Sequence, residues 1–110
     1  MRFVVIAEWD LGRYEVTIGE LREWVRKSGM AAYKGYPGVY LKAWYSNPQT
    51  NRWGAVYLVS RSDALNYDSL PRTVGDATGP IGTPPDFLHW HILECAVGGG
   101  DRLVQGMQVM

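Results

Sequence analysis

The chain has 110 residues, of which 46% are hydrophobic and 20% are charged, a composition typical of a globular domain and not of a disordered segment. Eleven basic and eleven acidic side chains cancel, so there is no excess positive charge to bind nucleic acid or an anionic membrane surface. No run approaches the roughly 18 apolar residues of a membrane span, and residues 3 to 7 are too short for a signal sequence. We therefore expect one soluble domain over residues 1 to 110, without nucleic-acid or membrane partners.

Aromatic side chains are unusually frequent, with five Trp, seven Tyr and two Phe. So many flat apolar groups in a small domain predict an aromatic-lined pocket, a subunit interface, or both. The single cysteine, Cys95, cannot form an intrachain disulfide and lies in an apolar run, which favours a small buried side chain and a reducing, cytoplasmic location.

The first elements along the chain are a strand and a helix. Residues 2 to 9 are rich in β-branched and aromatic side chains and predict a strand. Thr17 followed by Glu20 has the spacing of a capping box, which predicts a helix from residue 18 to about residues 28 and 29. The helix can re-form through MAAYK before Gly35 and Pro37 stop it. The apolar stripe that supports this helix consists of Ile18, Leu21, Trp24 and Val25.

Two strand-like runs, residues 38 to 46 and 52 to 60, flank the turn sequence NPQTN and predict an antiparallel hairpin. Alternation puts aliphatic and aromatic side chains on opposite faces of this hairpin. We expect the aliphatic set to pack beneath the helices and the aromatic set to lie on the open face. The aliphatic set is Val39, Leu41, Ala43, Gly54, Val56 and Leu58; the aromatic set is Tyr40, Lys42, Trp44, Trp53, Ala55 and Tyr57.

The second half of the chain begins with Ser62, which can cap a short helix that ends at Pro71. Residues 71 to 86 form a long loop rich in Gly and Pro, of the kind that often covers a binding site. A last strand is expected over residues 87 to 96, followed by a glycine turn and a tail, residues 101 to 110.

The predicted element order is βαββαβ, which indicates an α+β fold, the ferredoxin-like sandwich. This fold has a four-stranded antiparallel sheet with both helices on one face. The other face then carries an aromatic patch large enough to mark an interface, and a homodimer that stacks two open faces would bury it.

The segment GVYLKAWYSNPQTNRWGAVYLVSRSDALNY resembles the core of the YdhR-type monooxygenase family, within the dimeric α/β-barrel superfamily. The resemblance covers residues 35 to 70 by motif and the rest by strand order. It implies a ferredoxin-like homodimer that forms a dimeric α/β barrel, a pocket between sheet and helices, and an oxygenase activity. The matching positions are Gly38, Lys42, Trp44, Gly54, Tyr57, Leu58, Ala64, Leu65 and Tyr67.

The stretch FLHWHILEC contains both histidines of the chain, His89 and His91. Alternation on a strand places them on one face, with Trp90 on the other. Two imidazoles can ligate a metal ion, but no third histidine exists, and we predict no metal site. Two interpretations remain: a pocket histidine that acts as general base or hydrogen-bond donor, or interface histidines without a catalytic role.

Lys42 lies between Tyr40 and Trp44 in the aromatic set. A lysine among aromatic rings can have a depressed pKa or bind a substrate carboxylate, or it can extend to solvent from an edge strand. Trp44, Trp53 and Tyr57 can stack on a planar ligand or serve only as packing.

These observations favour a monooxygenase that uses no cofactor and acts on a small aromatic or polyketide-like molecule. His91 or His89 would be the base, Tyr57 and Lys42 the stabilisers of the substrate anion, and the substrate would bind among Tyr40, Lys42, Trp44 and Trp53. The alternatives are a non-catalytic dimer that binds a small hydrophobic ligand, and a lyase or isomerase.

Overall fold

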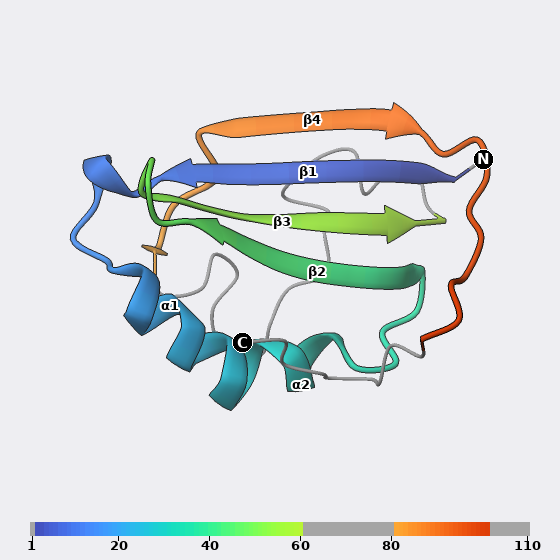
Figure 1. Ribbon diagram of the computed structural model, residues 1–110, viewed down its shortest axis with the longest axis horizontal. Coiled ribbons are helices and arrows are strands. Elements are labelled where there is room, and N and C mark those ends of the chain that lie inside the picture. The colour runs from blue at the N-terminus through green and yellow to red at the C-terminus, as the bar shows by residue number, and fades with distance from the viewer. Residues whose placement is uncertain (1, 61–80, 102–110) are drawn as a thin grey trace.

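A computed structural model describes residues 2–60 and 81–101 of the chain (Figure 1). Four antiparallel strands form one open sheet in the order β2-β3-β1-β4. The strands are β1 (Phe3–Asp10), β2 (Val39–Asn47), β3 (Arg52–Val59) and β4 (Phe87–Ile92). This α+β architecture is compatible with a ferredoxin-like fold. The second predicted helix, residues 71 to 80 of the predicted loop, and the tail beyond residue 101 lie outside the described residues.

One helical segment connects β1 to β2, after a short 3-10 helix, η1 (Leu11–Arg13). It consists of α1 (Ile18–Trp24), a π-helical stretch η2 (Val25–Gly29) and α2 (Met30–Tyr33). The predicted capping box is confirmed: the Glu20 backbone N–H donates to Thr17 Oγ1 over 3.1 Å, and the Thr17 N–H donates to Glu20 Oε1 over 3.3 Å. In the described chain, no helix has the length and apolar character that a membrane crossing requires.

The predicted hairpin is confirmed as β2 and β3. The Asn47 side chain orders its turn, since Asn47 Oδ1 accepts hydrogen bonds from the backbone N–H groups of Gln49 and Thr50 over 3.1 and 3.3 Å. Asn51 completes the turn with a φ of 53°, a left-handed conformation that asparagine tolerates. A β-bulge between Val39 and Leu41 then shifts the register at the far end of β2.

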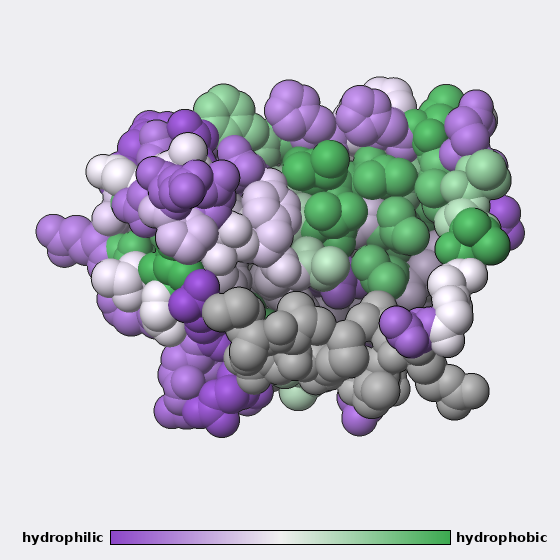
Figure 2. Space-filling view, in the orientation of Figure 1, coloured by the Kyte–Doolittle hydropathy of each residue, from purple (hydrophilic) through white to green (hydrophobic). Residues whose placement is uncertain are grey.

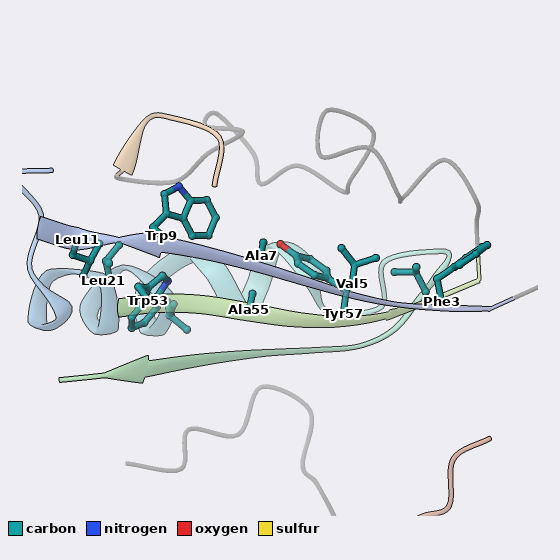
Figure 3. Packing of buried hydrophobic residues seen from close by; sticks show 11 residues of the cluster. Phe3, Val5, Ala7, Trp9, Leu11, Leu21, Trp53, Ala55 and Tyr57 are labelled. Atoms are coloured by element: carbon teal, nitrogen blue, oxygen red, sulfur yellow. The ribbon is translucent and has the colours of Figure 1, made fainter. Parts of the chain in front are cut away.

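The predicted assignment of the two sheet faces is wrong. Trp53, Ala55 and Tyr57 are buried in the core together with alternate residues of β1, on the face that the helical segment covers (Figure 3). The β1 residues of this core are Phe3, Val5, Ala7 and Trp9, and Leu21 and Val25 pack on them from the helical segment. Apart from Tyr40, the aromatic set therefore lies beneath the helix, and apart from Val39 the aliphatic set lies on the open face.

β4 is an edge strand that begins at a well-anchored turn. The side chain of Asp86 is only 7% exposed and accepts hydrogen bonds from the backbone N–H of Asp10 and the hydroxyl of Tyr14, both 2.8 Å long, and it pairs with Arg13. Burial alone would raise the pKa of Asp86, but these hydrogen bonds and the nearby guanidinium groups of Arg13 and Arg52 lower it below its usual range. Asp86 thereby anchors the start of β4 to the end of β1.

The chain after β4 differs from prediction. The strand ends at Ile92 and does not continue to residue 96, because pairing with β1 stops at Phe3. Cys95 follows in a segment without regular secondary structure and is exposed, so the expectation that it is a buried side chain is wrong.

Candidate functional site

The side-chain amino group of Lys42 lies inside a box of aromatic rings on the helix-covered face of the sheet. Its Nζ is 3.7 Å from the ring centroid of Tyr33 and 4.6 Å from those of Trp44 and Tyr57. β2 supplies Lys42 and Trp44, β3 supplies Tyr57 directly opposite Lys42, and α2 supplies Tyr33 from above. We call this group of four residues the lysine box.

Edge-to-face packing holds the rings of the lysine box in place. Tyr33 meets Trp44 with ring centroids 5.9 Å apart at 80°, and meets Tyr57 at 6.2 Å and 62°. This is the favoured geometry for aromatic pairs, and it directs ring faces and edges at defined positions around the amine. Tyr57 is buried, whereas Tyr33, Lys42 and Trp44 remain partly exposed.

Burial among these rings holds the pKa of Lys42 well below its usual range. The rings attract the ammonium through cation–π contacts, yet they offer much less stabilisation than water does, so the net effect favours the neutral amine. In the described part of the chain, Lys42 has no carboxylate partner that would restore the charged form. Lys42 thus lies among aromatic rings and has a lowered pKa, while its predicted role in substrate binding stays a prediction.

Tyr33 is the member of the lysine box that sequence reasoning missed. A signal for it exists, because Leu21, Val25, Gly29 and Tyr33 recur at intervals of four. In η2 the Met30 N–H bonds to the Val25 carbonyl, five residues earlier, and this wider turn keeps Val25 and Gly29 on the buried side. Tyr33 then follows one turn later and reaches the sheet above Lys42.

Two predicted ligand-binding residues lie outside the lysine box. Trp53 is buried opposite Trp9, four residues before Tyr57 on β3, which corresponds to about 13 Å along the strand. Tyr40 occupies the β-bulge of β2 and points to the open face, where its hydroxyl accepts a hydrogen bond from Arg2 Nε over 3.1 Å. This bond from Arg2 lowers the pKa of Tyr40. Of the four predicted substrate-binding residues, Lys42 and Trp44 therefore lie in the lysine box, whereas Tyr40 and Trp53 do not.

His89 and His91 lie on the open face, beside Ile6 and Val4 of β1. The prediction that the two histidines lie on one face of the sheet and Trp90 on the other is confirmed. Trp90 lies on the helix-covered side, where it meets Phe3 edge to face at 6.0 Å and 80°. A molecule bound at Lys42 is consequently separated from both imidazoles by the sheet, and the structure does not bring the predicted base and the predicted stabilisers together in one chain.

Among residues 2–60 and 81–101, no group of three His, Cys, Asp or Glu side chains is arranged to hold a metal ion. The three residues of the family motif in the second helix, Ala64, Leu65 and Tyr67, lie outside the described residues.

Two polar clusters bound the open face. At one end the Tyr45 hydroxyl crosses β3 at Gly54 and donates to Glu8 Oε1 over 2.7 Å, and Arg52 lies 3.6 Å from the other Glu8 oxygen. Burial, followed by the bond to Glu8 and its negative charge, raises the pKa of Tyr45 to about 12. At the other end, a hollow of about 420 Å³ is lined by Arg2, Tyr40, Ser60 and Leu93.

An aliphatic surface lies between these clusters (Figure 2). Its residues come from the three strands β1, β3 and β2, and the two histidines of β4 border it. We call it the open-face patch; it consists of Val4, Ile6, Leu41, Ala43, Val56 and Leu58.

No family model matches the sequence, and no curated protein matches it either. The resemblance to the YdhR-type family therefore stays a prediction.

Proposed function

We propose that the chain binds a small planar aromatic molecule at the lysine box and removes a proton from it with the uncharged amine of Lys42. The observation that carries this proposal is the lowered pKa of Lys42 in a box of three rings. A lysine with a lowered pKa holds more of its uncharged amine at neutral pH than an ordinary lysine does, and this amine can serve as a general base. Tyr33 and Trp44 are partly exposed beside the amine and are suited to stack on a flat ligand.

The same residue serves two steps of the reaction. Before proton transfer Lys42 is neutral and acts as the base. After the transfer it is an ammonium group held among the rings of Tyr33, Trp44 and Tyr57, next to the enolate or phenolate that it has formed. In a poorly solvated site this new positive charge stabilises the substrate anion strongly.

We propose more specifically that the deprotonated substrate is oxygenated, and the family resemblance supports this reaction. A methylene group between two aromatic rings that loses a proton gives an anion that reacts with O2. The balanced reaction is R2CH2 + O2 → R2C=O + H2O, so the substrate itself supplies all the electrons. The protein then needs to bind the ring system, take the proton and stabilise the anion.

Oxygen uptake with anthrone, a tricyclic ketone with such a methylene group, tests this proposal. We expect Lys42→Met and Lys42→Arg to lower the rate about a hundredfold or more, because methionine has no amine and arginine does not release its proton. Lys34→Met, which removes an exposed lysine, and the double variant His89→Ala/His91→Ala should keep the wild-type rate. Full activity of Lys42→Met would show that Lys42 is not the base.

Anthrone binding, measured by quenching of tryptophan fluorescence, separates the enzyme from a non-catalytic binder. Trp44 is in the lysine box, so a bound ring system should quench its emission. Saturable quenching with no oxygen uptake would favour the binder.

We also propose that the partner of this chain is a second copy of itself, bound through the open-face patch. The six aliphatic side chains of the open-face patch gather in the middle of one sheet face. Among the described residues, none of the six belongs to the hydrophobic core or packs against it. A continuous apolar surface of this kind usually marks an interface, and a two-fold dimer buries the same patch on both copies.

A further inference from the structure

β1 presents a self-complementary row of side chains on the open face. Arg2, Val4, Ile6 and Glu8 alternate with the buried residues of the strand, so all four lie on this face. The row reads positive, apolar, apolar, negative. At about 3.3 Å per residue, its charged ends are about 20 Å apart.

The open face as a whole has a similar pattern: the aliphatic open-face patch lies in its middle, and polar residues lie at both ends of the strands. Around Glu8, two carboxylates (Glu8 and Asp10) face one guanidinium, Arg52, and this end carries excess negative charge. Around Arg2 the surroundings are hydroxyl groups, those of Tyr40 and Ser60. In the described part of the chain Arg2 makes no ion pair, and it is exposed.

Two open faces can be stacked with their strands aligned in two ways. A two-fold axis parallel to the strands brings the Arg2 ends of both copies together, and likewise the Glu8 ends, which places like charges side by side. A two-fold axis that crosses the strands reverses one copy, so that each Arg2 end meets a Glu8 end. Like charges across an interface are costly and opposite charges are favourable, so the second arrangement is preferred.

We propose that two copies pack open face to open face with the two-fold axis crossing β1 between Val4 and Ile6, so that Arg2 of each copy pairs with the partner's Glu8. This inference rests on the dimer proposed above and adds its orientation. The hollow beside Arg2 gives the partner's Glu8 a place to enter, because its wall offers the guanidinium of Arg2 as a charged donor. In the middle, Val4 then lies against the partner's Ile6.

Charge reversal tests the pairing in the full chain. We expect Arg2→Glu and Glu8→Lys each to raise the dimer dissociation constant about tenfold or more in sedimentation velocity, because each homodimer then contains two like-charge contacts. An equimolar mixture of the two variants should regain wild-type association, because each contact across the mixed dimer again joins opposite charges. Native mass spectrometry should show the mixed dimer as the main species.

Glu8 also bonds to Tyr45, so near-UV circular dichroism must show that Glu8→Lys is folded. If it is not, Glu8→Gln replaces it, and its mixture with Arg2→Glu should associate more tightly than either variant alone. Variants that dimerise as tightly as the wild type, or whose mixture gains nothing, would overturn the orientation while leaving the dimer intact. A wild-type chain that stays monomeric at all concentrations would overturn the dimer itself.

Discussion

Replacing Lys42 with methionine is expected to make the protein more stable and, at the same time, inactive. Methionine has nearly the length of lysine but carries no charge, so it fits among Tyr33, Trp44 and Tyr57 without the cost of burying an ammonium group. We expect a gain of about 1 kcal/mol or more in the free energy of unfolding at pH 7, because folding of the wild type must either bury the charged amine or remove its proton. Opposite effects on stability and activity are typical of functional sites.

The pH dependence of this gain follows from the direction of the pKa shift. The pKa of Lys42 is lower in the folded than in the unfolded chain, so between these two values the unfolded wild type binds more protons and wild-type stability rises with pH. The advantage of Lys42→Met is therefore largest below the folded pKa. It should vanish above about pH 10.4, where lysine is neutral in both states.

Urea denaturation of the wild type and Lys42→Met between pH 6 and pH 11 measures this effect, with Lys34→Met as the matched control at an exposed position. A Lys42→Met variant that is less stable than the wild type at pH 7, or whose advantage is constant over this range, would mean that burial does not disfavour the charged amine.

Gly54→Ala is expected to destabilise the fold by about 2–3 kcal/mol, the usual range for forcing extra volume into a packed site with the loss of a hydrogen bond. A Cβ atom at residue 54 would lie 2.3 to 2.7 Å from ring atoms of Tyr45. Tyr45 crosses β3 at this glycine to reach Glu8. The ring must move, and the bond to Glu8 is lost.

The same substitution in a Tyr45→Ala chain tests the steric explanation directly. In a Tyr45→Ala chain the obstacle is absent, and Gly54→Ala should become neutral or stabilising by about 0.5–1 kcal/mol, because alanine loses less backbone freedom than glycine on folding. Thermal unfolding of the four proteins of this double-mutant cycle gives the comparison. If Gly54→Ala has the same effect in both backgrounds, steric contact with Tyr45 is not the reason for the glycine.

The elements near the N-terminus and the hairpin could be predicted from sequence because their signals are local. The capping box at Thr17 and the turn after Asn47 involve residues only a few positions apart, and both are present as predicted. Strand alternation likewise placed both histidines on one face. These features need no knowledge of the rest of the fold.

The assignment of faces could not be predicted in the same way. Alternation separates two sets of side chains but does not say which set the helix covers, and both sets in the hairpin are apolar enough to be buried. The pairing with β1 determines which face of the hairpin is buried. The buried residues of β1 lie beside the aromatic positions of β3; they are Phe3, Val5, Ala7 and Trp9. The bulge beside Tyr40 and the contact of Tyr33 with Lys42 likewise depend on tertiary packing.

The pKa of Lys42 is the quantity on which the proposed function depends most directly. The chain has three lysines, and the other two, Lys27 and Lys34, are exposed, so the side-chain ¹³Cε signals can be assigned with two single variants and followed by NMR as the pH is raised. We predict that the Lys42 signal titrates well below the others, and that anthrone changes its midpoint. A Lys42 signal that titrates at about pH 10.4, as in an unfolded chain, would contradict the account.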